Sequence, residues 1–287
     1  MRVIKVVKKM QTMARRWQSE KKRVSFVPTM GYLHAGHESL ITAARRRVGR
    51  SGVVVVSIFV NPTQFAATED LSRYPRNLEG DLVMCRRAGV DVVFAPSNEE
   101  MYPSETVEFS TYVSESFLSQ SMEGISRPTH FRGVATVVTK LFNIVLPSVA
   151  FFGAKDFQQA AVLRKMVGDL NIPLTVVVAP TLREPDGLAM SSRNAYLTPT
   201  QRTQAVVLSQ SITHARERVQ ASPKFLLSKT LSKEIEHLIR QQPEAEAEYI
   251  EFFHPDTLVP VTKILRGHHI ALAVRFGATR LIDNGPV

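Results

Sequence analysis

Two histidines lie three residues apart in a short stretch that also contains two glycines. The stretch reads Pro28-Thr29-Met30-Gly31-Tyr32-Leu33-His34-Ala35-Gly36-His37. A strand ending at residues 24–27 is predicted before it, and a helix running through Ile41, Ala44 and Arg47 is predicted after it. Histidines three positions apart on a first helical turn face the same way, so both imidazoles are expected to point at a ligand near the helix N-terminus.

A phosphate is the ligand that this position favours. The start of a helix has backbone N–H groups without helical partners and a partial positive charge. Gly31 and Gly36 carry no side chain that would block an approaching oxyanion. An imidazole N–H also donates to an oxyanion, and this donation stabilises most when negative charge develops during a reaction.

Two later segments supply further groups for phosphate binding. Gly153-Ala154-Lys155-Asp156-Phe157-Gln158-Gln159 follows an apolar strand predicted at residues 149–152. We expect its Lys155 and Gln159, four positions apart, on one face of a helix. Met190-Ser191-Ser192-Arg193 offers two hydroxyls and a guanidinium on a loop. The composition of that loop fits a surface linker with capping serines equally well.

Polar residues also follow a second apolar run. Residues 52–60 predict a central parallel strand covered on both faces, and Asn61-Pro62-Thr63-Gln64-Phe65 comes directly after it. Open α/β sheets bind ligands beyond the carboxyl ends of their strands, which makes Gln64 a candidate. Taken alone, Gln64 is better explained as a loop amide that faces water. Arg132 is either a phosphate clamp or the partner of a structural carboxylate.

These strings together resemble one enzyme family. His-x-Gly-His after a first strand is similar to the signature of the nucleotidyltransferase superfamily. The longer string at residues 28–37, with its partners at 153–159 and 190–193, resembles pantothenate synthetases, which are pantoate–β-alanine ligases. The resemblance covers nearly the full length, densely to about Thr198. The sequence departs from the family pattern at Ala154, where glutamate is usual, and at Gly80, where some relatives carry a second acid.

The resemblance implies a two-step reaction with ATP. The carboxylate of pantoate attacks the α-phosphorus, giving pantoyl adenylate and pyrophosphate, and the amine of β-alanine then gives pantothenate and AMP. The implied catalytic residues are His34, His37 and Lys155. The implied ligands of pantoate and β-alanine are Gln64, Gln159, Met30 and Phe65. The implied ATP-binding residues are Met30, Gly31, Tyr32, Leu33, His34, Ala35, Gly36, His37, Gly153, Ala154, Lys155, Asp156, Leu182, Met190, Ser191, Ser192 and Arg193. The implied Mg²⁺ ligand is Asp81, which in isolation reads as a solvated helix residue.

Strands and helices alternate through the first two thirds of the chain. Besides the elements above, helices are expected at residues 3–16, 78–88 and 134–146, strands at 90–95 and 174–178, and a short alternating piece at 106–113. This order predicts an α/β fold, a Rossmann-like parallel sheet with helices on both faces. Residues 1–184 are therefore expected to form a nucleotide- and pantoate-binding domain.

A smaller α+β domain is expected at residues 185–287, forming a lid over the site. Thr198, with Pro199 and Gln201 after it, predicts a capped helix start. Helices at 202–219 and 224–241 and strands at 247–253, 270–274 and 280–282 follow. These elements no longer alternate strand by strand with helices, which favours a separate unit.

The composition is that of an ordinary globular protein. Of 287 residues, 44% are hydrophobic and 22% charged, which excludes a disordered chain. The net charge of +10 admits an RNA-binding module, but no aromatic residues are interleaved with the basic clusters as stacking platforms. We expect neither nucleic acid nor membrane as a partner. A single cysteine, Cys85, allows no internal disulfide, and a cytoplasmic location is expected.

Two other functions stay open on the residues. A different nucleotidyltransferase would share the His-x-Gly-His turn but would release a dinucleotide or a nucleotide-activated alcohol. A non-enzymatic RNA-binding module would use the basic surface, and its affinity would fall steeply with salt. The resemblance also implies a homodimer, which the residues by themselves do not indicate.

Overall fold

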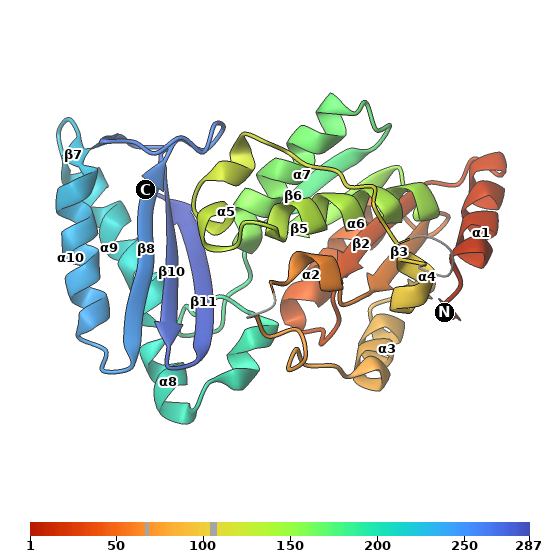
Figure 1. Cartoon of the computed structure of the whole chain (residues 1–287), viewed down its shortest axis with the longest axis horizontal. Coiled ribbons are helices and arrows are strands. Elements are labelled where there is room, and N and C mark those ends of the chain that lie inside the picture. The colour runs from red at the N-terminus through yellow and green to blue at the C-terminus, as the bar shows by residue number, and fades with distance from the viewer. Residues whose placement is uncertain (67–68, 104–107) are drawn as a thin grey trace. The chain divides into compact units, whose positions relative to one another are not determined.

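The chain divides into two compact units. In the computed structural model, which describes residues 1–66, 69–103 and 108–287, the N-terminal unit comprises residues 1–119, 123–154 and 159–180. The C-terminal unit comprises residues 120–122, 155–158 and 181–287. Figure 1 shows both units and labels most of their helices and strands. The predicted division at residues 184 and 185 and the lid role stay predictions.

A six-stranded parallel sheet forms the centre of the N-terminal unit. Its strands, in order across the sheet, are β1 (Arg2–Ile4), β4 (Val92–Phe94), β3 (Val53–Ile58), β2 (Val24–Thr29), β5 (Val149–Gly153) and β6 (Thr175–Ala179). Runs of β-branched residues form these strands because such residues pack well on a pleated surface buried on both sides. The predicted α/β fold with a parallel sheet is confirmed.

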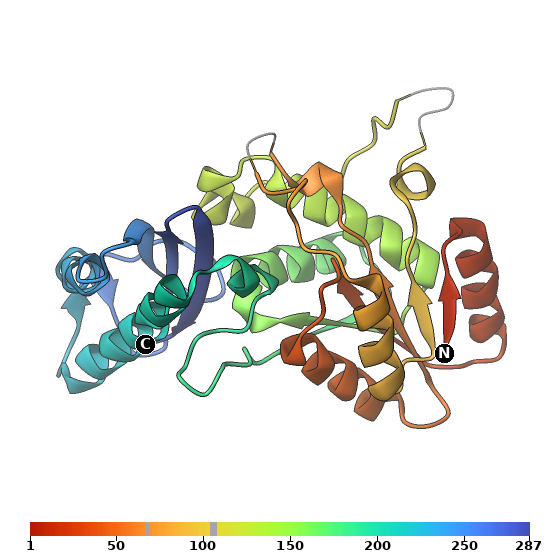
Figure 2. The same ribbon diagram turned by 90° about the horizontal axis from the view of Figure 1, so that it is seen from below.

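Helices cover both faces of this sheet, as Figure 2 shows. One face packs against α1 (Val7–Ser19), α6 (His130–Val145) and α7 (Phe157–Asp169), and the other against α2 (Ala35–Val48) and α3 (Leu78–Arg87). Successive strand residues alternate between the two cores. Val55 belongs to the first core and Val56 to the second. This period of two is the geometry of a strand.

The chain reverses its direction across the sheet at β2. From β2 it proceeds to β3 and β4 on one side, and it later returns to place β5 on the other side of β2. The β2 neighbours are therefore the next strand and a strand more than a hundred residues away. Ligands of open α/β sheets bind at such a switch point, beyond the carboxyl ends of the strands. The loop with the two histidines leaves β2 at that edge.

Two local predictions for residues 1–184 were wrong. Residues Arg2–Ile4 form β1 beside β4 and are not part of the first helix, which begins at Val7. A turn of 3-10 helix, η3 (Ala154–Asp156), precedes α7, so Lys155 and Gln159 do not share one α-helical face. The alternating piece at 106–113 lies partly outside the described residues, and residues 108–113 form no strand. The remaining short elements here are η1 (Pro62–Gln64), α4 (Asn98–Met101), η2 (Leu118–Gln120) and α5 (Glu123–Ser126).

An antiparallel sheet and two helices form the C-terminal unit. The sheet order is β11 (Thr279–Pro286), β10 (His269–Phe276) and β8 (Ala245–Phe253), and α9 (Val207–Ala221) and α10 (Ser228–Arg240) pack beside it (Figure 1). A second pair is β7 (Leu226–Leu227) with β9 (Lys263–Ile264). The short helices are η4 (Ser192–Tyr196) and α8 (Pro199–Gln204).

Helix starts in the C-terminal unit were predicted with mixed success. The capping box at Thr198 is confirmed, since Gln201 N–H donates to the Thr198 hydroxyl at 3.2 Å and Gln201 Oε1 accepts from Thr198 N–H at 3.1 Å. The helix predicted at 202–219 is divided into α8 and α9, and the helix predicted from 224 begins at Ser228, after β7. In the described parts of the chain, none of the helices has the length and apolarity to cross a membrane.

Candidate active site

The two histidines cap the helix α2. His34 is the N-cap residue, and its Nδ1 accepts the Gly36 N–H at 3.2 Å. The Nδ1 of His37 accepts the His34 N–H at 3.3 Å. The two ring centroids are 4.1 Å apart. The prediction that both imidazoles share the first turn and face the same way is confirmed.

These caps decide where each imidazole carries its proton. A nitrogen that accepts a backbone N–H uses its lone pair, so the Nδ1 of His34 and of His37 is unprotonated in this network. The proton of each neutral ring then resides on Nε2. Both histidines consequently have an N–H donor at the end of the ring that is remote from the helix backbone.

Several backbone N–H groups of this loop already have partners, contrary to expectation. Tyr32 and Leu33 donate to the Asp81 carboxylate at 2.9 and 2.7 Å. His37 N–H donates to the His34 carbonyl at 2.8 Å, and the two caps occupy the His34 and Gly36 N–H groups. Side-chain acceptors of Asp81, His34 and His37 thus occupy backbone donors that the sequence suggested were open to phosphate. The imidazole Nε2–H groups are therefore further donors in this turn.

Asp81 is buried in the first turn of α3. It is 3% exposed, and its two oxygens each accept one of the loop N–H groups. Burial raises the pKa of the Asp81 carboxyl above its ordinary value, and the two N–H bonds oppose that rise. Within residues 1–66, 69–103 and 108–287, no group of three or more His, Cys, Asp or Glu side chains is placed to hold a metal ion. The Mg²⁺ role of Asp81 stays a prediction.

Gln64 lies against Met30 at the end of β2. Its Nε2 donates to the Met30 sulfur at 2.9 Å, and its Oε1 accepts from Asn61 Nδ2 at 3.2 Å. Gln64 is 7% exposed, so it is not the loop amide facing water that the sequence alone favoured. Phe65, also predicted for the pantoate site, is buried and meets Tyr74 edge to face at 6.0 Å.

Sequence reasoning missed the residues that hold Gln64. Asn61 accepts the Tyr102 hydroxyl at 2.7 Å and donates to the Gly133 carbonyl at 3.2 Å. A Cβ on Gly133 would lie 2.4 Å from the carbonyl oxygen of Thr63, so glycine lets α6 approach this turn. Asn61 had a signal, since it begins the polar string after β3. Tyr102 had no such signal, because it contacts Asn61, which lies 41 residues away in the sequence.

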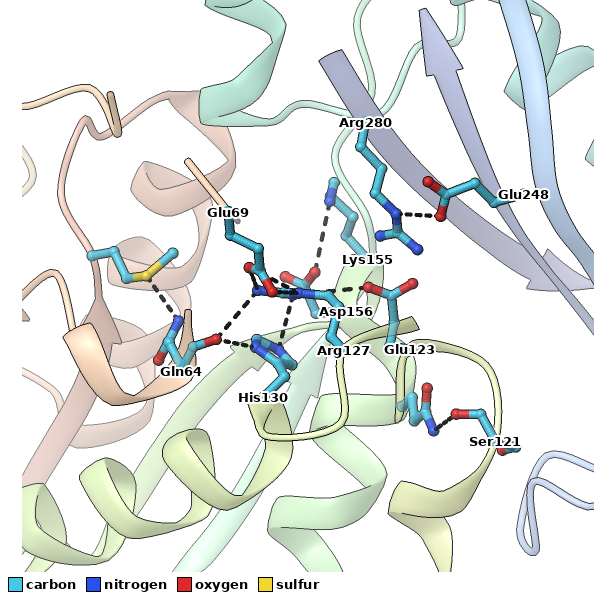
Figure 3. A network of polar contacts seen from close by, with 12 residues as sticks. Gln64, Glu69, Ser121, Glu123, Arg127, His130, Lys155, Asp156, Glu248 and Arg280 are labelled. Atoms are coloured by element: carbon cyan, nitrogen blue, oxygen red, sulfur yellow. Dashed lines mark hydrogen bonds and ion pairs between the residues drawn. The ribbon is translucent and has the colours of Figure 1, made fainter. Parts of the chain in front are cut away.

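A partly buried polar network lies against residues 62–64 (Figure 3). His130 Nδ1 lies 3.0 Å from the Gln64 carbonyl, and its Nε2 lies 3.2 Å from a guanidinium nitrogen of Arg127. Arg127 pairs with Glu69 at 2.6 Å and lies 3.8 Å from Glu123. Burial, with the charge of Arg127, lowers the pKa of His130 to about 4. A neutral His130 therefore donates from Nδ1 to Gln64 and accepts from Arg127.

Lys155 belongs to the C-terminal unit and lies in the turn η3. Its ammonium pairs with Asp156 (Figure 3), with the two charged atoms 3.6 Å apart, and its carbonyl accepts from Asn284 Nδ2 at 2.7 Å. Asn284 is on β11, so this strand fixes the backbone of the lysine. Gly153, at the end of β5, precedes Lys155 by two residues. The prediction that Lys155 follows a strand at a turn is confirmed, and its catalytic role stays a prediction.

The serine and arginine string follows a hairpin within the C-terminal unit. Met190 N–H donates to the Leu182 carbonyl at 3.0 Å, which closes the hairpin. Arg183 in the hairpin makes two hydrogen bonds to Asp283 on β11, at 2.7 and 2.9 Å. Ser191 then caps η4 by accepting the Arg193 N–H at 3.3 Å. The capping serine of the alternative explanation is thus present, and phosphate binding by this string stays a prediction.

The predicted residues belong to both compact units. The N-terminal unit holds the histidine turn with Met30 and Gln64, and the C-terminal unit holds Lys155 and the serine string. Gln159, half-buried on α7, belongs to the N-terminal unit. Arg132, which the sequence left between two roles, is exposed and lies 4.8 Å from the centre of the Tyr112 ring.

A parallel α/β sheet with a donor-bearing helix start at its switch point defines a nucleotide-binding α/β protein. The comparison with known families makes the class specific. The family profile described as pantoate-beta-alanine ligase matches residues 2–286. The chain belongs to this family.

The similarity to known proteins covers almost the whole length of the chain. A pantothenate synthetase of Pelobacter propionicus is 49% identical over 284 residues, which cover 99% of this chain and 97% of the relative. The crystal structure of pantothenate synthetase from Thermus thermophilus has a TM-score of 0.90 at 44% identity and covers 99% of each chain. A Francisella tularensis ligase, solved with "Beta-gamma ATP" and β-alanine, has a TM-score of 0.79 at 33% identity, covering 100% of this chain and 97% of that one.

Proposed function

We propose that the chain condenses pantoate with β-alanine at the expense of ATP, through a pantoyl-adenylate intermediate. The observation that carries this proposal is the family match over residues 2–286, combined with the histidine-capped helix at the switch point of the sheet. The Francisella relative supports it, because that protein was solved with an ATP analogue and β-alanine. The chain is then an AMP-forming ligase.

The first step transfers an adenylyl group. A carboxylate oxygen of pantoate bonds to the α-phosphorus, the bond to the β-phosphate oxygen breaks, and pyrophosphate leaves. Negative charge grows on the phosphate oxygens, and the Nε2–H donors of His34 and His37 are suited to stabilise it. In this proposal Lys155, with Ser191, Ser192 and Arg193, neutralises the remaining phosphate charge. No covalent bond to the protein is needed.

The second step forms the amide. The amine nitrogen of β-alanine attacks the acyl carbon of the adenylate, AMP leaves with the electrons of the broken bond, and the nitrogen loses a proton. Gln64 would orient pantoate through the second N–H of its amide, because Asn61 occupies the amide oxygen and the Met30 sulfur accepts one amide N–H. Gln159 and Phe65 complete the proposed pantoate site. Holding the two reactants in this way accounts for most of the expected acceleration.

Mg²⁺ is proposed to accompany ATP. This ion often binds through substrate phosphates with one or two carboxylates, and it would neutralise charge on the phosphates when bound. The family resemblance implies Asp81 as such a carboxylate, but both of its oxygens accept backbone N–H groups, which disfavours this role. We further propose a homodimer in the cytoplasm, with residues 185–287 acting as a lid; family membership is the support for these points.

Product analysis tests the function. Purified protein is incubated with ATP, Mg²⁺ and pantoate, with and without β-alanine, and the products are separated. AMP and pantothenate are expected together, and only when β-alanine is present. A dinucleotide or a nucleotide-activated alcohol would instead indicate another nucleotidyltransferase, and salt-sensitive RNA binding without turnover would indicate a binding module.

Substitution tests the assigned roles. His37→Ala and Lys155→Ala are each expected to lower kcat/KM by on the order of a hundredfold or more, because each removes a donor to the developing charge. His237→Ala is the matched control, since His237 is exposed on α10. Wild-type kcat/KM in either of the first two variants would refute the role of that residue.

A further inference from the structure

The Asp81 carboxylate ties α3 to the loop between β2 and α2. Its Oδ2 accepts from Tyr32 N–H at 2.9 Å, and its Oδ1 accepts from Leu33 N–H at 2.7 Å. These partners lie 49 and 48 residues away in the sequence, so the contact is long-range. Asp81 is buried, and hydrogen bonds to a charged acceptor away from water are stronger than those between neutral groups.

The loop held by Asp81 has a backbone shape that needs an external restraint. Gly31 and Tyr32 both have positive φ angles, 88° and 52°. Glycine adopts such angles freely, whereas a residue with a Cβ does so at a disadvantage. A Cβ on Gly31 would also lie 3.1 Å from Asp81 Oδ2, so the carboxylate and the loop are closely packed. The pair of hydrogen bonds compensates for the unfavourable conformation of Tyr32.

The histidine tautomers depend on that loop. Leu33 directly precedes His34, whose own N–H donates to His37 Nδ1 at 3.3 Å. The reciprocal cap, from Gly36 N–H to His34 Nδ1, measures 3.2 Å. Both distances are at the long end of the range for N–H hydrogen bonds, so a small shift of the loop would break them. Without the caps, this network would no longer favour Nε2 over Nδ1 as the protonated nitrogen.

We propose that Asp81 is a positioning residue for the condensation reaction. It holds the turn at Tyr32 and Leu33 in place so that His34 and His37 keep their Nε2–H donors at the site. The kinetic consequence rests on the proposed function, whereas the tautomer consequence does not. This role differs from metal coordination, because it uses both carboxylate oxygens on backbone donors of the chain.

Substitution of Asp81 by asparagine tests the role with little change in shape. The amide retains one acceptor oxygen but turns an NH₂ donor toward the other loop N–H, so one of the two bonds is lost. Glu79→Gln is the matched control, because it removes the same charge from an exposed position in the same helical turn. Both variants are made in the full-length chain.

Imidazole nitrogen NMR of the metal-free protein gives the first readout. In the wild type, the long-range ¹H–¹⁵N signals of His34 and His37 are expected to show the Nε2–H tautomer. In Asp81→Asn they are expected to move toward a mixture of tautomers, and in Glu79→Gln to stay unchanged. A metal ligand would have no effect in protein without metal, and a general loss of stability would not select these two rings.

Kinetics give the second readout. Asp81→Asn is expected to lower kcat by roughly 10–100-fold at saturating ATP, as for other substitutions that disturb the support of a reactive group. The Mg²⁺ concentration for half-maximal rate is expected to stay at the wild-type value. Glu79→Gln is expected to keep wild-type kcat. If the wild type shows no ligase activity, the proposed function fails, and the NMR comparison still decides whether Asp81 sets the tautomers.

Relief of the strained residue gives a third, independent test. Tyr32→Gly removes the penalty for a positive φ at residue 32. Asp81→Asn is therefore expected to lower kcat by a smaller factor in the Tyr32→Gly background than in the wild-type background. The double variant can also be measured if the single variant Asp81→Asn does not fold. Unchanged imidazole signals in Asp81→Asn, or a raised Mg²⁺ requirement without a tautomer change, would overturn the proposal.

Discussion

Gly133→Ala is expected to disturb both the stability of the N-terminal unit and the binding of pantoate. Gly133 lies inside α6, where a glycine-to-alanine change at an open position stabilises by about 0.5–1 kcal/mol. Position 133 is not open. The new Cβ would lie 2.4 Å from Thr63 O and 2.6 Å from the nitrogen and Cα of Gln64.

The magnitude follows from these contacts. Ordinary contact begins at 3.4 Å, so the backbone at Thr63 and Gln64 must retreat by roughly 1 Å. Overpacking of this kind costs about 1–3 kcal/mol, and the free energy of unfolding is expected to fall by about 2 kcal/mol, or about 4–8 °C in Tm. A displacement of roughly 1 Å at a positioning residue costs on the order of a hundredfold in rate, here in kcat/KM for pantoate.

Calorimetry and kinetics check the prediction beside a matched variant. Gly168→Ala makes the same change in α7, where nothing lies within 4 Å of the new Cβ. That variant is expected to gain about 0.5–1 kcal/mol and to keep wild-type kinetics. If Gly133→Ala were as stable as the wild type, or if the two variants shifted Tm alike, the inferred close approach of α6 to the Gln64 turn would be refuted.

Two further predictions concern buried ionisable groups. In the unfolded chain His130 has an ordinary pKa near 6.5, but it titrates at about 4 when folded, so the unfolded state alone gains a proton as pH falls between these values. The free energy of unfolding is expected to fall by roughly 3 kcal/mol over that range. In His130→Asn, urea titrations at several pH values should show a smaller dependence of this free energy on pH, and the same dependence as in the wild type would contradict the prediction. Arg183→Met leaves the fully buried Asp283 carboxylate without its cation, which is expected to cost about 3–5 kcal/mol in urea unfolding. Adding Asp283→Asn should recover much of this loss, and no recovery would show that the pair is not the cause.

Local patterns were sufficient for most of the sheet and for two helix starts. The apolar run at Val53–Ile58 predicted a strand covered on both sides, and its residues do alternate between two cores. His34 and Thr198 were placed at helix starts because each precedes a helical pattern, and both are N-caps. Such features depend on neighbours within a few residues, which a sequence displays directly.

Contacts between distant segments were not predictable in the same way. The strand Arg2–Ile4 has only three residues, too few for a period, and exists because β4 pairs with it. Asp81 looked like a solvated helix residue, since its partners Tyr32 and Leu33 are almost fifty positions away. The same contact gives the Tyr32 and Leu33 N–H groups an acceptor that no local pattern in the sequence indicates.

The strand order has a consequence for how the site is assembled during folding. Val24 of β2 pairs with Val53, 29 residues on, whereas Ser25 pairs with Val149, 124 residues on. Closing the longer loop costs roughly 1.3 kcal/mol more in chain entropy. We therefore expect β2 and β3 to associate first. The turn at residues 28–37 would then form before β5 joins β2 and completes the switch point. Pulse-labelled hydrogen exchange should protect the β3 amides earlier than those of β5, and simultaneous protection would contradict this order.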